Sequence, residues 1–185
     1  LALQGDYQAH VDRVTALGVR AVPVRTADKL RDADALVLPG GESTAMLRLM
    51  ESDGLLAVIR QLVRDGMPLL ATCAGVILAA REIEPPQESL GVLDITVRRN
   101  AYGRQLQSSV ETLRSSPDLG GDQTMEGVFI RAPRILALGD GVIALAHRDQ
   151  EPVLVQQDGI IAATFHPELT ADERVHRRFV ELIQR

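Results

Sequence analysis

Residues 68–78 are Pro-Leu-Leu-Ala-Thr-Cys-Ala-Gly-Val-Ile-Leu, and the rest of the chain is organised around this stretch. The apolar run up to Thr72 is typical of a buried strand, and the apolar segment that opens with Ala74 and Gly75 is typical of a helix. The turn between them holds Cys73, the only cysteine. At such a turn, the dipole and free N–H groups of the helix favour a thiolate and can stabilise an oxyanion. The alternative is that Cys73 is a small buried hydrophobic side chain, the usual role of a lone cysteine.

Strands and helices alternate in the first part of the chain, up to about residue 82. This order predicts a parallel sheet with helical crossovers. The strands expected here are 1–3, 19–24, 35–38 and the apolar run before Cys73. The helices expected here begin near Asp6, Ala45 and Leu55, and a further one follows Cys73.

The second half differs, because short apolar stretches are joined by polar loops. We expect strands at 95–98, 106–112, 125–130, 136–138, 142–147, 153–157 and 160–164. A closing helix has Thr170 and Glu173 as an expected capping box. We therefore predict one α/β domain over residues 1–185. It would be a flavodoxin-like three-layer sandwich with a mostly parallel central sheet flanked by helices, plus short antiparallel strands in the second half.

The composition excludes several classes of function. The chain of 185 residues is 45% hydrophobic, which suits one domain with a proper core. A net charge of −5 argues against binding to nucleic acid or to an anionic membrane. No apolar stretch is long enough to span a bilayer. One cysteine cannot form an internal disulfide, so we expect a reducing, cytoplasmic setting.

A cysteine nucleophile needs a base, and His166 is the best candidate among the histidines. It follows an apolar strand, and Pro167 disfavours a helical conformation for it. Glu168 lies two residues further on, so its carboxylate could accept the imidazole N–H and fix the tautomer. The alternative is a solvated histidine and a helix-start glutamate. For the other histidines we expect surface or packing roles: His10, His147 and His176.

Two further stretches follow apolar strands. Pro39-Gly40-Gly41-Glu42-Ser43 could bring backbone N–H groups close to a phosphate or an oxyanion, or could be only a tight turn into a capped helix. It is not a Walker loop. The basic cluster over 98–105 and Arg131 suit a small carboxylate or phosphate better than nucleic acid, and a solvated loop is the alternative for the cluster. No metal-ligand spacing is present, so we predict no metal site.

Taken together, these motifs resemble a known family. The segments 38–44, 72–75 and 165–169 are similar to the motifs of the triad-type, class I glutamine amidotransferases. Segments 2–5, 99–105 and 129–133 resemble, more narrowly, the glutaminase subunits of pyridoxal 5′-phosphate synthases. The resemblance runs from the first residues to the last helix, and the combination of motifs is specific.

The resemblance implies a mechanism and a set of site residues. Cys73 would attack the side-chain amide of L-glutamine, His166 would move the proton, and Glu168 would orient the imidazole. A glutamyl thioester would form and be hydrolysed. Backbone N–H groups of Gly41 and Ala74 would form the oxyanion hole. The glutamine would be held by Gly41, Glu42, Ser43, Arg99, Ile130 and Arg131. No cofactor is implied.

The resemblance also implies a partner. A (β/α)₈-barrel synthase subunit would receive the ammonia within a large hetero-oligomer and would switch the glutaminase on when the two dock. Two alternatives stay open at this point. The chain could serve another synthase, such as that for imidazole glycerol phosphate, or it could be a non-catalytic regulatory module on the same fold.

Overall fold

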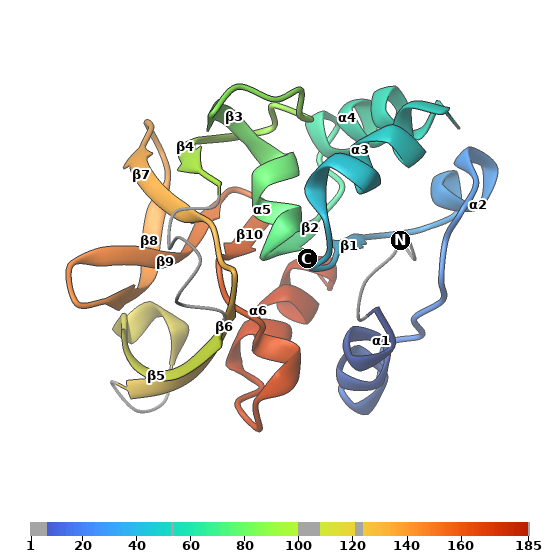
Figure 1. The fold of residues 1–185 in the computed structure, drawn as a ribbon. Coiled ribbons are helices and arrows are strands. Elements are labelled where there is room, and N and C mark those ends of the chain that lie inside the picture. Colours follow the sequence, from blue (N-terminus) through green and yellow to red (C-terminus); the bar gives the residue numbers. More distant parts are fainter. Residues whose placement is uncertain (1–6, 53, 100–107, 121–123, 185) are drawn as a thin grey trace.

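The computed structural model describes residues 7–52, 54–99, 108–120 and 124–184, so the strand expected over 1–3 lies outside the described residues. Figure 1 shows the arrangement of the elements. The helices are α1 (Tyr7–Ala16), α2 (Ala27–Arg31), α3 (Ser43–Ser52), α4 (Leu55–Arg64), α5 (Ala74–Ala79) and α6 (Arg174–Ile183), with short 3₁₀ turns η1 (Pro117–Leu119) and η2 (Pro167–Leu169). The strands are β1 (Leu36–Leu38), β2 (Leu69–Thr72), β3 (Ala80–Glu84), β4 (Leu93–Arg98), β5 (Ser108–Ser115), β6 (Thr124–Ile130), β7 (Arg134–Leu138), β8 (Ile143–Arg148), β9 (Glu151–Gln157) and β10 (Ile160–Ala163).

The described strands form two sheets, with the orders β1-β2-β10-β9-β8-β5-β6 and β3-β4-β7. In the larger sheet β1, β2 and β10 run parallel, and the other pairs are antiparallel. The prediction of a mostly parallel central sheet is therefore wrong, because the sheet is mixed and mostly antiparallel. Loops of two residues join β8 to β9 and β9 to β10. Such loops allow hairpins but are too short for the crossover that a parallel pair needs.

Helices cover both faces of the parallel part of the sheet (Figure 1). Successive side chains of β2 point to opposite faces. Leu69 and Ala71 belong to the apolar cluster that includes α3, α4 and α5, whereas Leu70 belongs to the cluster that includes α6. All residues of β2 and β10 are buried, as expected for strands covered on both sides. The layered α/β arrangement predicted from the sequence is therefore found in this part of the molecule.

One local prediction is also wrong, and one strand was missed. Residues 19–24 form no strand, although they are rich in β-branched residues. Pro23 has no N–H for a ladder, and the side chain of Val22 is 57% exposed. Strand β3 was not predicted, because Ala80 and Ile83 are its buried residues and this spacing does not alternate. Sequence patterns therefore predicted the positions of most elements but not the mostly antiparallel order of the central sheet.

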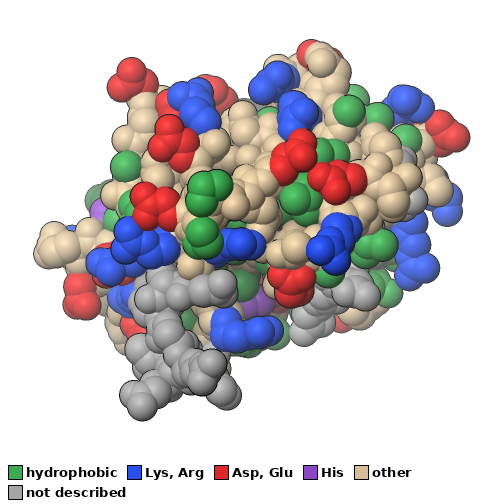
Figure 2. All heavy atoms as spheres, turned by 45° about the horizontal axis from the view of Figure 1, so that its top comes forward, with side chains coloured by type: hydrophobic (Ala, Val, Ile, Leu, Met, Phe, Trp, Pro, Cys, Tyr) green, Lys and Arg blue, Asp and Glu red, His purple; other side chains and the backbone are tan. Residues whose placement is uncertain are grey.

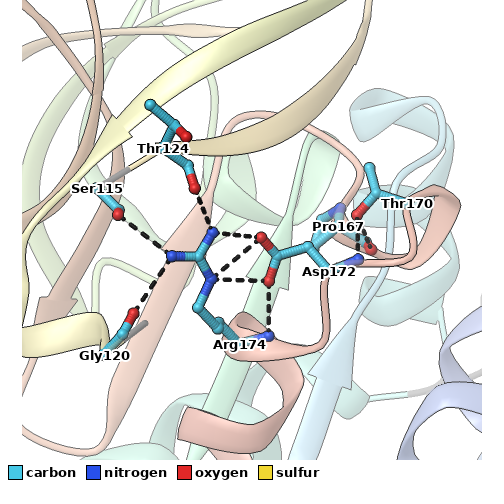
Figure 3. A network of polar contacts seen from close by, with 7 residues as sticks. All are labelled: Ser115, Gly120, Thr124, Pro167, Thr170, Asp172 and Arg174. Carbon is cyan, nitrogen blue, oxygen red and sulfur yellow. Dashed lines mark hydrogen bonds and ion pairs between the residues drawn. The ribbon is translucent and has the colours of Figure 1, made fainter. Parts of the chain in front are cut away.

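The start of α6 is not capped by the expected capping box of Thr170 and Glu173. The side chain of Asp172 accepts a hydrogen bond from the backbone N–H of Arg174 at 3.0 Å, and Glu173 makes no capping bond. The Arg174 guanidinium bonds to Asp172 and also reaches Ser115 and the carbonyls of Gly120 and Thr124 (Figure 3). This network ties the segment between η2 and α6 to the β5–β6 pair.

The surface carries mixed charge. On the face seen in Figure 2, the described Lys and Arg side chains are interspersed with Asp and Glu. The net charge of −5 is therefore not concentrated in a single patch on this face. Within the described parts of the chain, none of the helices combines the length and the apolar composition needed to cross a bilayer.

Candidate active site

The candidate site lies where three parallel strands end. The register pairs Leu38 of β1 with Ala71 of β2, and Thr72 of β2 with Ala163 of β10. The segments that follow these strands therefore leave the same edge of the sheet. They carry the Gly40-Gly41 loop, Cys73 and His166. In open α/β sheets, this edge is where ligands bind.

Cys73 occupies a sharp turn between β2 and α5. Its φ of 48° and ψ of −106° are unusual for a residue with a side chain, which makes it a strained position of the kind found at functional sites. Its backbone N–H donates to the carbonyl of Ala163 at 2.9 Å, which fixes the turn against β10. The thiol is 7% exposed, and its Sγ lies 3.7 Å from the carbonyl oxygen of Ile130. The strand, turn and helix predicted around Cys73 are confirmed.

His166 and Glu168 form a buried pair. Nδ1 of His166 lies 2.7 Å from Oε1 of Glu168, so this nitrogen carries the hydrogen and donates it to the carboxylate. The backbone N–H of His166 donates to the carbonyl of Val128 at 2.8 Å, which ties the histidine to β6. Pro167 then begins η2, and this tight turn places Glu168 back beside the ring. The expected approach of the two side chains is therefore present.

Electrostatics favour an ionised pair at this site. Burial alone would lower the pKa of His166, but its hydrogen bonds with Cys73 and Glu168 and the charges of both raise that pKa to about 10. Burial would likewise raise the pKa of Glu168, but the hydrogen bond from His166 and the nearby imidazoles hold that pKa below its usual value. At neutral pH the His166 imidazole is therefore protonated, with the Glu168 carboxylate on one side and the Cys73 sulfur on the other.

The Gly-Gly loop packs directly against this pair. A Cβ at Gly40 would lie only 2.5 Å from Cε1 of His166 and 3.5 Å from Cβ of Cys73. Gly41 follows with a φ of 155°, a value that glycine adopts readily, and it is exposed. Sequence reasoning singled out the Gly40-Gly41 pair but gave a site role to Gly41 only. The lack of a side chain at Gly40 gives the His166 ring its space.

Three predicted binding residues gather at the start of α3. Glu42 accepts hydrogen bonds from the backbone N–H groups of Thr44 and Ala45, at 3.0 and 2.7 Å, and these bonds lower its pKa. Arg99 bonds through Nη1 to the side-chain oxygen of Gln87, and Ser43 lies 3.4 Å from the same oxygen. Sequence reasoning did not find Gln87. The rest of the basic cluster, 100–105, lies outside the described residues.

Ile130 ends β6, and Arg131 follows it toward the same edge. The Ile130 carbonyl faces the thiol, as described above. Arg131 has a φ of 45°, and its side chain is exposed. Ala74 begins α5, so its backbone N–H has no carbonyl partner within that helix. Cys73 therefore contacts both Ile130 and His166, so the ends of three strands meet at this point.

A model of the SNO glutamine amidotransferase family matches residues 1–185. The chain belongs to this family. The "Pyridoxal 5'-phosphate synthase subunit PdxT" of Thermotoga sp. (strain RQ2) is 48% identical over 185 residues, which cover 100% of this chain and 97% of that protein. The protein of the same name from Koribacter versatilis (strain Ellin345) is 49% identical over 185 residues, with coverage of 100% and 94%. The resemblance noted from the sequence motifs is thus confirmed.

Solved structures agree with this assignment. A crystal structure described as a glutamine amidotransferase has a TM-score of 0.91 to this chain at 45% identity, and the match covers 100% of this chain and 97% of that one. A crystal structure described as a GMP synthase subunit from Thermoplasma acidophilum has a TM-score of 0.69 at 19% identity, covering 98% and 89%. This second likeness shows a shared fold only.

In this glutamine amidotransferase, two histidines expected at the surface or in packing roles are buried beside the site. His10 on α1 is 3% exposed, and His176 on α6 is fully buried. His10 lies close to Glu168 and to Thr72, the residue that precedes Cys73. One signal was present in the sequence: His10 shares a helix face with Val14, four residues on, and that face is buried.

Proposed function

We propose that Cys73, His166 and Glu168 hydrolyse the side-chain amide of L-glutamine to glutamate and ammonia. The chain is a glutaminase of the glutamine amidotransferase type, the subunit that supplies ammonia for making pyridoxal 5′-phosphate. The observation that carries the triad proposal is the 2.7 Å pair of His166 and Glu168 beside a strained cysteine at a helix start.

The proposed reaction begins with the thiol proton of Cys73 moving to His166, which leaves a thiolate. The sulfur attacks the amide carbon and forms a tetrahedral oxyanion. The N–H of Ala74, which has no helical partner, and the N–H of Gly41 would hold this oxyanion. His166 then gives its proton to the leaving ammonia, and a glutamyl thioester remains. Water attacks the thioester, with His166 taking a proton from it, and glutamate and the thiolate are released.

The glutamine would lie against the start of α3 and the end of β6. Glutamine carries an α-carboxylate and an α-ammonium group, so its site needs both signs of charge. Arg99 and Arg131 would supply the positive charge and Glu42 the negative charge. Gly41, Ser43 and Ile130 would contribute short polar contacts close to the thiol. Two sets of contacts support this placement. Ser43 and Arg99 both contact the side-chain oxygen of Gln87, and the Ile130 carbonyl lies beside the Cys73 sulfur.

The enzyme works with a synthase subunit, since curated relatives that share nearly half its sequence are named as subunits of pyridoxal 5′-phosphate synthase. We propose further that this partner is a (β/α)₈ barrel, that the two form a large hetero-oligomer, and that ammonia passes between them without release to solvent. A cytoplasmic location stays a prediction from the single cysteine.

The decisive experiment uses the Cys73→Ala variant together with the synthase subunit. We expect no glutamate release above background, while gel filtration shows that the variant still docks. Ammonium salt should restore pyridoxal 5′-phosphate formation by the variant complex, because the synthase then needs no glutaminase. Glutamate release that survives the substitution would refute the mechanism.

The two alternatives predict other results. A chain that serves another synthase would be activated by that synthase and not by the pyridoxal 5′-phosphate enzyme, so both should be compared. A non-catalytic module would leave Cys73 unlabelled by a reactive glutamine analogue, even with the synthase bound.

A further inference from the structure

The second carboxylate oxygen of Glu168 stands out in the buried site. Oε1 bonds to His166, but Oε2 has no hydrogen bond of good geometry with any described residue, although the side chain is almost fully buried. The nearest donor is Nε2 of His10, which lies 3.3 Å from Oε2. A buried carboxylate oxygen without a donor is costly, so a group at this distance is well placed to supply one.

His10 is itself held in place on both sides of its ring. Nε2 lies 3.1 Å from Oγ1 of Thr72, and Nδ1 lies 3.1 Å from Nε2 of His176. Nε2 faces both the Oε2 carboxylate oxygen and the Thr72 hydroxyl oxygen, and a bare lone pair there would repel the negative charge. Nε2 therefore carries a hydrogen, which lies within reach of both oxygens. Burial, with the nearby charges of His10 and Arg13, lowers the pKa of His176 to about 3, so His176 is neutral at neutral pH.

A second contact links α1 to the same turn. Nε of Arg13 donates to the backbone carbonyl of Glu168 at 3.3 Å, and its Nη2 donates to the carbonyl of Thr170. Helix α1 therefore reaches the Glu168 side chain with His10 and the backbone of η2 with Arg13. Through Thr72, His10 also contacts the residue that precedes Cys73.

We propose that His10 is a positioning residue for the glutaminase reaction: its Nε2–H holds Oε2 of Glu168, so that Oε1 stays aligned with Nδ1 of His166. The inference rests on the proposed function of the triad. A carboxylate held at one oxygen can rotate about its last bond, whereas one held at both cannot. His176 in turn sets the orientation of His10. Among the residues that the structure describes, the charged or titratable groups around Glu168 are His10, Arg13, His166 and His176.

The test compares two substitutions of His10 that keep different atoms. In His10→Gln, the amide nitrogen reaches the position of Nε2, whereas in His10→Asn it reaches only that of Nδ1. With the synthase bound, we expect His10→Asn to lower kcat for glutamate release about tenfold, with KM nearly unchanged. His10→Gln should restore most of the loss. The matched control is His147→Asn on β8, which should behave as the unsubstituted protein.

The pH profile separates positioning from packing. Without the donor at Oε2, the pKa of Glu168 rises, so the acid limb of kcat/KM should move to higher pH in His10→Asn but not in His10→Gln. Equal losses in both variants, or an unshifted profile in His10→Asn, would overturn the proposal. Thermal unfolding of each variant checks that it is folded.

A measurement without turnover keeps this inference apart from the proposed function. The Nδ1 proton of His166, held by Glu168, gives a strongly downfield resonance in proton NMR. We expect this signal in the unsubstituted chain and in His10→Gln, and its loss or upfield shift in His10→Asn. An unchanged signal in His10→Asn would refute the role of His10. A chain that releases no glutamate with any synthase would instead refute the proposed function.

Discussion

The contact between Gly40 and the His166 ring leads to a quantitative prediction for Gly40→Ala. The new Cβ would lie 2.5 Å from Cε1 of His166, whereas carbon atoms pack at about 3.5 Å, so the ring must move by about 1 Å. The ring is tied to Glu168 by a 2.7 Å hydrogen bond, and Cys73 lies on the other side of the new methyl group. A displacement of this size misaligns the base with the sulfur, and misplacements of about 1 Å cost about a hundredfold in rate.

We therefore expect Gly40→Ala to lower kcat for glutamate release about a hundredfold in the complex with the synthase. The assay measures glutamate in the presence of saturating glutamine, and thermal unfolding reports whether the chain is intact. The matched control is Gly159→Ala, where the nearest atom to a new Cβ is 3.7 Å away and the backbone has no positive φ. A Gly40→Ala enzyme with kcat within about twofold of the unsubstituted one would refute the argument, as would an equal loss in Gly159→Ala.

Two further predictions concern stability. The pKa of His176 is about 3 in the folded chain and near 6.5 when unfolded, so the unfolded chain binds the extra proton in this window and stability falls as the pH falls. His176→Gln should reduce the slope of the unfolding free energy against pH between those two pKa values, by up to about 1.4 kcal/mol per pH unit. Urea titrations at several pH values measure this slope, and an unchanged slope would contradict the prediction. Gly75→Ala should prevent stable folding, because the new Cβ would lie 2.2 Å from the carbonyl oxygen of Leu38 and this backbone cannot move aside easily. A cooperative thermal transition near that of the unsubstituted protein would disprove this.

The candidate site could be predicted from the sequence because its parts follow apolar strands. The runs before Cys73, His166 and the Gly40-Gly41 loop are short and mostly apolar, and strands of this kind lie side by side in the buried part of an α/β sheet. The nearness of Glu168 to His166 also followed from local spacing. These inferences need only the direction of the strands and the position of polar residues at their ends.

Other parts could not be predicted, because they depend on contacts between distant segments. Gln87 meets Arg99 and Ser43 only in the folded chain, and His10 meets Glu168 across 158 residues. Antiparallel strands were expected in the second half, but not that they join β1 and β2 in one sheet and make most of its pairs antiparallel. The apolar pattern of a buried strand is the same in parallel and antiparallel sheets. Only the two-residue loops around β9 carried the information on direction.

The place of β10 has a consequence for the order in which the chain folds during synthesis. This strand lies between β2 and β9, so a strand that is made long after β2 fills the position next to it in the sheet. Until about residue 163 has emerged, β2 can pair with β1 only, and its other edge stays open. Contacts of such long sequence separation form slowly, and an open apolar edge is prone to pair with other chains. Cys73, at the end of that strand, therefore meets Ile130 and His166 only after the chain as far as residue 166 has been made.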